Sequence, residues 1–330
     1  MSPAPAELDV LGIGAAIVDV LAHVDEGFLT ERQLVKGSMA LIDDRQAADL
    51  YRALGPAVEI SGGSTANTLA GVASFGGRAA FVGKVRDDQL GDVFAHDISA
   101  VGVRYGTARA TAGPETARCL ILVTPDAQRT LNTFLGVSAQ LDSADIREAE
   151  VASAAVTFSE AYLWDSPSAR DALLRAMATA RSAGRRVAFS LSDGFCVERH
   201  RADFLELIRD QLDIVFGNRD EICSLYQLED FEQALSRVRD DIETAFVTRG
   251  AEGSVVLAGG ERHDVPAHPV EKLVDTTGAG DLYAAGVLYG LTNGHDLETS
   301  GRLGSLAAAE VISHLGARPE ISLAELAKSL

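Results

Sequence analysis

Short runs of apolar residues alternate along the chain with segments that have the periodicity of helices. The near-continuous apolar runs predict strands buried on both faces of a sheet, at Leu8–Gly14, Ala79–Val85, Val156–Leu163, Val187–Leu191, Ile214–Asn218, Ala245–Thr248 and Gly253–Leu257. Helices are predicted between them, at Ser64–Ser74, Gln89–Ala100, Ser168–Ala183, Arg201–Leu212, Phe231–Asp241 and Ala279–Leu291. This alternation indicates a parallel sheet that is covered by helices and joined by right-handed crossovers.

Two stretches, Asp19–Asp43 and Gly106–Phe134, break the alternation. Both have the β-branched and polar positions of strands, without an intervening helical pattern. Separate surface hairpins would explain them, and so would one small sheet that both stretches build and that acts as a lid. We expect a single domain over residues 1–330, with a lid formed by about residues 19–43 and 106–134.

The composition is that of a globular protein without a membrane span. Hydrophobic residues make up 47% of the 330 residues, which suffices for a core, and no apolar run is long enough for a transmembrane helix. The net charge of −19 argues against nucleic acid as a partner, although a local anion site remains compatible with it. Three widely spaced cysteines form no disulfide or zinc pattern, and the N-terminus lacks the features of a signal peptide. We therefore expect a cytoplasmic protein.

Two glycine-containing segments come close to nucleotide-binding motifs but are incomplete. Gly12–Gly14 follows a predicted strand, yet Ile17 stands where a dinucleotide-binding loop has its third glycine. Gly83-Lys84 lacks the first glycine of a P-loop, since position 78 is Arg78, and Val85 replaces the hydroxyl residue. Neither a Rossmann-type dehydrogenase nor a P-loop enzyme is therefore predicted.

The strongest chemical signal is the segment Val274–Gly286, in which a polar, glycine-rich turn leads directly into an apolar helix. Small residues let backbone N–H groups converge there, and the helix N-terminus adds unpaired donors and a partial positive charge. Such a turn binds anions. Asp281 is either an ordinary first-turn residue or a base that takes a proton from a hydroxyl group while the turn holds a phosphoryl group. The combination of carboxylate and anion site favours the base.

The segment Asp275–Asp281 (D-T-T-G-A-G-D) resembles the C-terminal signature of the ribokinase/PfkB family of carbohydrate and nucleoside kinases. Other family elements occur in matching order, at Asp19, Gly62–Asn67 (G-G-S-T-A-N), Gly83–Gly91, Asn218–Glu221 (N-R-D-E) and Val247–Gly253. Arg86 is a departure, because the family usually has a glycine there. The resemblance extends over about residues 8–320, and it is greater to the adenosine-kinase-like bacterial branch than to fructose or hexose kinases.

The resemblance implies an α/β fold of the ribokinase-like type, which is a three-layer α/β/α sandwich with a mostly parallel central sheet and a small β-sheet lid. It also implies an ATP-dependent phosphotransferase, in which an acceptor hydroxymethyl group attacks the γ-phosphate in line. Asp281 would be the catalytic base, and the backbone N–H groups of Gly278, Ala279 and Gly280 would stabilise the phosphoryl group. Lids of several relatives pair, so a monomer and a homodimer through the lid are alternatives.

The resemblance also assigns the binding residues. The acceptor hydroxyls would be bound by Asp19, Gly63 and Asn67. ATP would be bound by Asn218, Glu221, Thr248, Gly250 and Gly253, and Glu221 would hold Mg²⁺ through water. A K⁺ ion, which many relatives bind, would have Asp275 and Thr277 as candidate ligands. Arg249 replaces a commonly apolar residue and would reach either an ATP phosphate or solvent.

The identity of the acceptor is the weakest inference from the sequence. Met39, Leu41 and Phe134 lie in the two irregular stretches and offer apolar surface for a purine, although they would serve equally as the core of the lid. A nucleoside is therefore expected, with adenosine favoured, and ribose, fructose or a related free sugar is the alternative. A kinase fold that only binds ligands is a third reading, which the intact Asp281 and its glycine turn disfavour.

Overall fold

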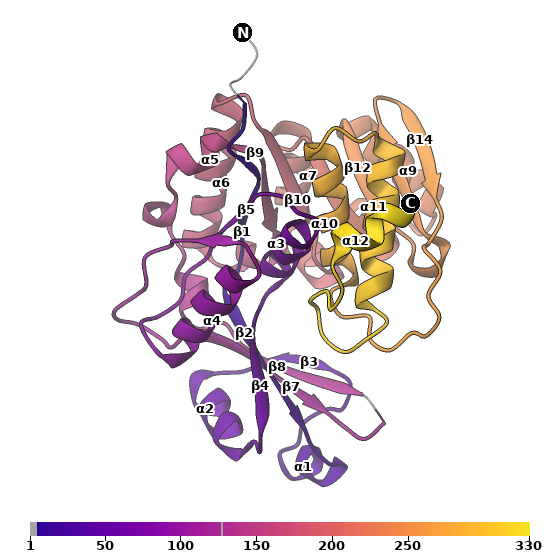
Figure 1. Ribbon diagram of the computed structural model, residues 1–330. Coiled ribbons are helices and arrows are strands. Elements are labelled where there is room, and N and C mark those ends of the chain that lie inside the picture. Colours follow the sequence, from indigo (N-terminus) through magenta and orange to yellow (C-terminus); the bar gives the residue numbers. More distant parts are fainter. Residues whose placement is uncertain (1–4, 127) are drawn as a thin grey trace.

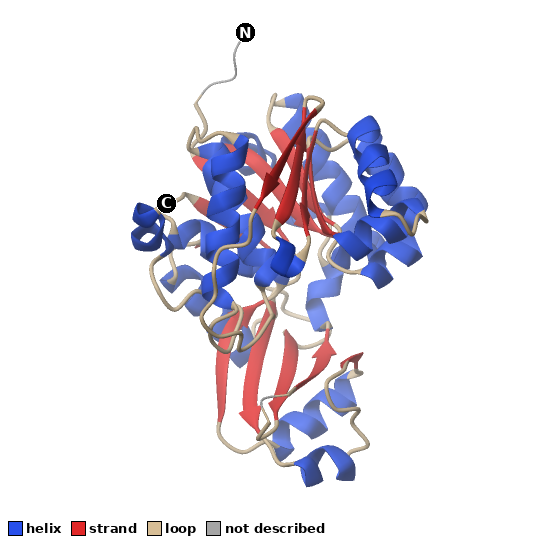
Figure 2. Cartoon of the chain, turned by 90° about the vertical axis from the view of Figure 1, so that its right-hand side faces the viewer, coloured by secondary structure: helices blue, strands red, loops and turns tan. Residues whose placement is uncertain are grey.

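The computed structural model describes residues 5–126 and 128–330, which contain two sheets of different size (Figures 1 and 2). Within this part of the chain the larger sheet has nine strands, in the order β14-β13-β12-β11-β10-β9-β1-β5-β6. Neighbouring strands are parallel except where β13 pairs with β12 and with β14. The strands are β1 (Leu8–Ile13), β5 (Ala79–Val82), β6 (Arg104–Tyr105), β9 (Ala154–Glu160), β10 (Arg186–Ser190), β11 (Ile214–Asn218), β12 (Thr244–Thr248), β13 (Ser254–Ala258) and β14 (Glu261–Val265).

Helices cover both faces of this sheet and complete three layers (Figure 1). One apolar core lies against α5 (Glu148–Ser153), α6 (Pro167–Ser182), α7 (Gly194–Asp210), α8 (Arg219–Tyr226) and α9 (Phe231–Asp241). The other lies against α3 (Ser64–Ser74), α4 (Gln89–Ala100), α10 (Ala279–Thr292), α11 (Leu297–Val311) and α12 (Leu323–Leu326). The expected α/β/α sandwich with a mostly parallel sheet is confirmed. None of the helices in the described residues has the length and hydrophobicity that a membrane span requires.

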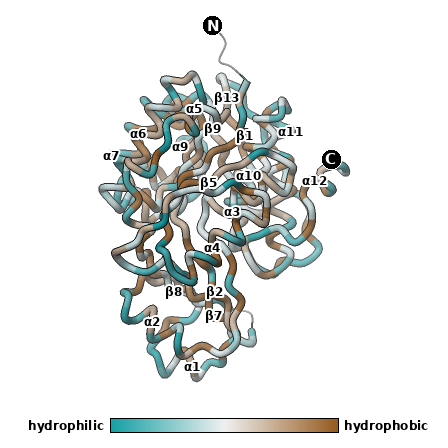
Figure 3. Tube along the Cα trace, turned by 60° about the vertical axis from the view of Figure 1, so that its left-hand side comes forward, coloured by the Kyte–Doolittle hydropathy of each residue, from teal (hydrophilic) through white to brown (hydrophobic). Residues whose placement is uncertain are grey.

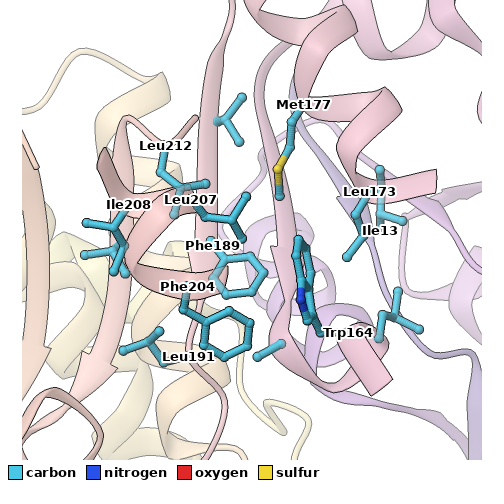
Figure 4. Close-up of a cluster of buried hydrophobic side chains, with 14 of the residues drawn as sticks. Ile13, Trp164, Leu173, Met177, Phe189, Leu191, Phe204, Leu207, Ile208 and Leu212 are labelled. Atoms are coloured by element: carbon cyan, nitrogen blue, oxygen red, sulfur yellow. The ribbon is translucent and has the colours of Figure 1, made fainter. Parts of the chain in front are cut away.

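Aromatic packing stiffens the first core behind the strands that reach the site. Trp164 packs edge-on against Phe189 and Phe204, with ring centroids 6.2 and 5.8 Å apart (Figure 4). Such pairs add about 0.5–1.5 kcal/mol to the burial of their apolar area. Hydrophobic residues lie mostly along interior segments of the chain, and hydrophilic residues along outer loops and helices (Figure 3). The strands therefore present their ends from a rigid support.

The two irregular stretches contribute to one second sheet, so separate hairpins do not describe them. Its order in the described residues is β3-β8-β7-β2-β4, and it lies apart from the large sheet (Figure 2). Its strands are β2 (Ile17–His23), β3 (Met39–Leu41), β4 (Ala57–Gly62), β7 (Ala117–Val123) and β8 (Arg129–Phe134). We call this sheet, with α1 (Glu26–Glu31) and α2 (Asp44–Ala53), the lid. The lid therefore extends to β4 beyond the expected residues 19–43, and it contains helices that the pattern did not indicate.

Most elements follow the expected ranges, and the differences have local causes. The helices α3, α4 and α9 begin and end as predicted. By contrast, α7 begins at Gly194 instead of Arg201, because Asp193 caps it by accepting the N–H of Cys196, and a kink at His200 interrupts its periodicity. The pattern also did not indicate α8, α11 and β14.

Gly12 and Gly14, which come close to a dinucleotide-binding motif, have a packing role. A Cβ on Gly12 would lie 2.5 Å from the side chain of Thr65, and a Cβ on Gly14 would meet the same residue at 2.5 Å. Glycine is therefore required because α3 crosses β1 closely. This crossing brings the N-terminus of α3 to the carboxyl end of the large sheet.

Candidate active site

Most of the residues predicted to carry chemistry meet in a cavity of about 540 Å³ at the carboxyl ends of the large sheet. Open α/β sheets bind ligands at this edge, where the loops after parallel strands converge. The wall combines lid strands, strand ends of the large sheet and the start of α10. Its residues include Ile17, Asp19, Cys119, Ile121, Leu131, Thr133, Tyr162, Asn218, Glu221, Thr248, Gly250, Gly278, Ala279, Gly280 and Asp281.

The turn before α10 has the backbone of an anion-binding site. Gly278 precedes the helix with a φ of 79°, and a Cβ there would lie 2.7 Å from the Cβ of Ala317, so glycine is required. The N–H of Ala279 donates to the carbonyl of Thr276 (3.2 Å), whereas those of Gly278 and Gly280 have no hydrogen-bond partner among the described residues. Gly278 and Gly280 therefore contribute free donors at this helix N-terminus.

Asp281 joins the N-termini of α10 and α3. Its Oδ1 accepts a hydrogen bond from Oγ of Ser64 (2.6 Å), and its Oδ2 accepts one from Nδ2 of Asn67 (3.1 Å). Burial raises the pKa of Asp281, and the two hydrogen bonds oppose that change. Because the carboxylate is directed to α3 and not to its own backbone, it is not a helix cap. A carboxylate with a raised pKa beside free N–H donors suits a general base.

Asp19 projects from β2 into the same cavity. A Cβ on Gly62 would lie 2.3 Å from Oδ2 of Asp19, so the carboxylate packs directly on the backbone of β4. Burial raises the pKa of Asp19 to about 6, the positive charges of Arg318 and Arg129 lower it, and the negative charge of Asp281 raises it. The structure thus brings Asp19 together with Asn67 and Asp281.

Gly63 also lines the cavity, but the backbone conformation and the close approach of a neighbouring segment are what require glycine at this position. Its φ is 96°, and a Cβ would lie 2.3 Å from the carbonyl oxygen of Ala15.

Glu160, which the sequence did not single out, fixes the segments that meet beside Gly63. Its carboxylate accepts the N–H groups of Ala15 (2.9 Å) and Thr65 (2.7 Å), so it joins the end of β9 to the segment after β1 and to α3.

Asn218 and Glu221 form a capping box at the start of α8. The Asn218 side chain accepts the N–H of Glu221 (2.9 Å), and Glu221 accepts the N–H (3.0 Å) and Nδ2 (2.6 Å) of Asn218. Burial raises the pKa of Glu221 to about 7, and the backbone hydrogen bond from Asn218 lowers it. Both residues line the cavity, so the box presents a carboxylate there.

The strand end at Thr248 is only partly as expected. Thr248 and Gly250 line the cavity. Gly253 is not among the lining residues; its φ is 83°, and a Cβ would lie 2.1 Å from the carbonyl oxygen of Val265, so it is required by the turn to β13. Arg249 is expected from the sequence to reach either an ATP phosphate or solvent. Its side chain instead forms an ion pair with Asp264 on β14 (3.1 Å).

The apolar wall differs from the predicted one. Partners in the parallel β3–β8 pair share a face, so Met39 and Leu41 lie on the face of Leu131 and Thr133, but at an exposed edge outside the cavity. Phe134 lies on the opposite face, with its ring 5.4 Å from the guanidinium of Arg118. The prediction for Phe134 is therefore corrected, because one step along a strand reverses the side-chain direction.

Other apolar residues take that place and were missed. They are Cys119 and Ile121 of β7, Leu131 of β8, and Tyr162 after β9. The alternation of β7 would have indicated Cys119 and Ile121 as face partners of Asp19 had the register been known. Tyr162 carries no local signal, because only the fold brings it to the cavity.

A buried carboxylate beside a helix N-terminal anion site, at the carboxyl end of a parallel sheet that a small second sheet adjoins, is the arrangement expected of a phosphotransferase. Comparison with known proteins agrees: residues 47–323 match the pfkB family carbohydrate kinase. The chain belongs to this family, whose members use ATP and typically Mg²⁺. It is 32% identical over 238 residues to Fructokinase-1 of Oryza sativa subsp. japonica, which covers 70% of this chain and 73% of that protein.

Two solved structures are similar over nearly the whole chain. One is adenosine kinase from Sinorhizobium meliloti, with 52% identity, a TM-score of 0.91 and coverage of 98% of this chain and 99% of that one. The other is a probable sugar kinase protein from Rhizobium etli CFN 42, with 50% identity, a TM-score of 0.91 and coverage of 98% of both chains. These similarities support the adenosine-kinase-like bacterial branch.

Proposed function

We propose that the protein transfers the γ-phosphate of ATP to the hydroxymethyl group of a purine nucleoside, with adenosine favoured. The observation that carries this proposal is the composition of the cavity wall, where the polar pair Asp19 and Asn67 adjoins an apolar surface made by Cys119, Ile121, Leu131 and Tyr162. Carboxylate and amide groups suit vicinal hydroxyls, and an aromatic ring among apolar side chains suits a base. The similarity to an adenosine kinase at 52% identity supports the same acceptor.

The chain's own residues account for the proposed reaction. Asp281 would take the proton of the acceptor hydroxymethyl group as its oxygen attacks the γ-phosphate in line. The free N–H groups of Gly278 and Gly280 would receive the charge on the phosphoryl oxygens, and loss of one such donor typically costs about 3–4 kcal/mol. Asp19 and Asn67 would hold the acceptor, and closure of the lid would exclude water from the transfer.

The residues present fit a water-mediated Mg²⁺ ion. Glu221 is a buried carboxylate on the cavity wall, and within residues 5–126 and 128–330 its oxygens accept hydrogen bonds only from Asn218, in the capping box. Carboxylate oxygens keep further lone pairs for bound water, and magnesium retains several waters in such sites. A bound Mg²⁺ neutralises charge on the ATP phosphates.

The side-chain carboxylate of Asp275, in contrast, does not fit a K⁺ site in this arrangement, because groups of the protein already engage both of its oxygens. Oδ1 of Asp275 accepts both the N–H (3.1 Å) and the hydroxyl (2.7 Å) of Thr277. Its Oδ2 accepts the N–H of Gly316 (3.2 Å) and lies 2.6 Å from Nη1 of Arg129. A guanidinium already neutralises this carboxylate, so no step is assigned to a monovalent cation.

A free sugar is the second candidate acceptor, because the Rhizobium etli neighbour is described as a probable sugar kinase and the rice relative is a fructokinase. The test is ATP-dependent release of ADP with adenosine, other nucleosides, ribose and fructose, using the full chain with Mg²⁺. We expect the highest kcat/KM for adenosine. A kcat/KM for ribose or fructose that equals or exceeds it would overturn the nucleoside assignment and leave the phosphotransferase intact.

A further inference from the structure

An arginine with buried guanidinium nitrogens acts electrostatically on Asp19 and Asp281 and has no part in the assignments above. Nη2 of Arg318, in the loop after α11, donates to the carbonyl oxygen (2.7 Å) and to Oγ (2.9 Å) of Ser61. Asp97 of α4 accepts the N–H (2.9 Å) and the hydroxyl (2.5 Å) of the same serine. Ser61 therefore joins three segments, which are β4, α4 and the C-terminal loop.

This network adjoins the part of β4 on which Asp19 packs. Ser61 is opposite Val18 in the antiparallel β2–β4 pair, and the next residue is Gly62, on whose backbone the Asp19 carboxylate packs. A movement of Ser61 would therefore change the place of the Asp19 carboxylate. Arg318 and Asp97 restrain that movement from two sides.

Two nitrogens of the Arg318 guanidinium make no hydrogen bond to the described residues. Nε and Nη1 of Arg318 are buried and have no hydrogen-bond partner among the described residues. Burial lowers the pKa of Arg318 to about 10, and the negative charges of Asp97, Asp19 and Asp281 raise it, so the side chain is protonated at neutral pH. A buried cation of this kind is stable only when anions lie close to it.

We propose that Arg318 is a positioning residue that acts through Asp19: it supplies the positive charge that compensates Asp19 and Asp281, and it restrains the backbone on which Asp19 packs. The inference rests on the proposed function, in which Asp19 binds acceptor hydroxyls. An anionic carboxylate accepts hydrogen bonds from both hydroxyls of a vicinal pair, whereas a protonated one must use one oxygen as a donor. Arg318 keeps Asp19 in the accepting form.

Other groups also face Asp19 and define what the test must separate. Arg129 from β8 is a second positive charge, which lowers the pKa of Asp19 less than Arg318 does, and Asp281 from α10 raises it. Cys119 from β7 lies opposite Asp19, and burial raises the pKa of its thiol to about 12, so it is uncharged at neutral pH. Of the two positive charges that lower the pKa of Asp19, Arg318 has the larger effect, and a substitution of Arg318 removes this one.

The variants Arg318→Gln and Arg318→Lys separate charge from hydrogen bonding in the full chain. Glutamine keeps a donor for Ser61 and loses the charge, and lysine keeps the charge. By calorimetry at pH 7 we expect the Kd for adenosine to rise roughly tenfold to a hundredfold in Arg318→Gln, with partial recovery in Arg318→Lys and little change in the Kd for ATP. Arg45→Met removes an arginine whose side chain is 92% exposed, and it should match the wild type.

A second measurement needs no turnover. The carboxyl resonance of Asp19, assigned by its loss in Asp19→Asn, should titrate at higher pH in Arg318→Gln than in the wild type or in Arg318→Lys. An unchanged midpoint, or an equal loss of ATP and adenosine binding, would overturn the proposal. If the wild type bound neither adenosine nor a sugar, the proposed function would fail, and the titration would still decide the charge effect of Arg318.

Discussion

Arg129 of lid strand β8 and Asp275 of the loop before α10 form a buried ion pair, with 2.6 Å between Nη1 and Oδ2 and side chains that are 7% and 8% exposed. The same carboxylate binds Thr277 and the N–H of Gly316. One side chain of the lid is therefore connected to both loops that flank the anion site. This contact links the position of the lid to the geometry of the phosphoryl site.

Removal of one partner should loosen the lid. In Arg129→Met the Asp275 carboxylate keeps its hydrogen bonds but loses its counter-charge, and breaking a buried pair in this way costs about 3–5 kcal/mol. We expect a lower free energy of unfolding in urea and faster hydrogen exchange in β7 and β8. Lys36→Met breaks the solvent-exposed pairs of Lys36 with Asp126 and Glu26 on the lid, and each such pair contributes less than about 1 kcal/mol. Equal effects of the two substitutions would contradict the role given to the buried pair.

Loss of the base should affect turnover and not nucleotide binding. Asp281→Asn keeps the shape of the side chain and removes its ability to accept a proton, so kcat should fall by about 10²–10⁴-fold. The Kd for ATP, measured by calorimetry, should stay close to that of the wild type. Ser64→Ala removes one hydrogen bond to Asp281 and leaves the base in place, so its kcat should fall far less. A kcat near the wild-type value in Asp281→Asn would exclude this residue as the base.

The ionised form of Asp19, which the proposed binding of acceptor hydroxyls requires, should lower the stability of the folded protein. Its pKa is raised from 3.8 to about 6 in the folded protein, so ionisation costs stability as the pH rises through this interval. Asp19→Asn should therefore be more stable than the wild type above pH 6, by up to about 3 kcal/mol, and the gain should disappear below pH 4. The acceptor KM of the same variant should rise roughly tenfold to a hundredfold, while the KM for ATP stays constant. Chemical denaturation at several pH values and steady-state kinetics would measure both effects.

Selectivity for a base should depend on Tyr162 and not on Phe134. Tyr162 lines the cavity, and stacking of a base on an aromatic side chain is worth about 1–3 kcal/mol, so Tyr162→Ala should lower kcat/KM for adenosine by roughly 5- to 150-fold. Any activity on ribose should change little. Phe134→Ala is the matched control, because its ring packs on the other face of the lid and its loss should reduce stability alone. Loss of adenosine selectivity in Phe134→Ala would contradict this placement and indicate that Phe134 contacts the base.

Local sequence determined the large sheet, its helices and the core of the site. Apolar runs such as Ile214–Phe216 have one stable environment, a strand buried on both faces. The helices α4 and α9 begin at the aspartates Asp88 and Asp230, whose side chains cap them, and α3 begins at Gly63 without a side-chain cap. The glycine turn before Asp281 specifies a helix N-terminus by backbone chemistry alone. The fold and the family followed from these segments and are confirmed, and the roles of the individual site residues stay predictions.

Only the tertiary structure decided the contacts between segments distant in the sequence. The side on which a lid residue lies depends on strand register, and a shift of one residue separates Phe134 from Thr133 on opposite faces. The partners Arg129 and Asp275, or Arg318 and Ser61, are more than a hundred residues apart, and no local pattern relates them. Charges in a buried site act through space, so their partners become known only when the fold has brought them together.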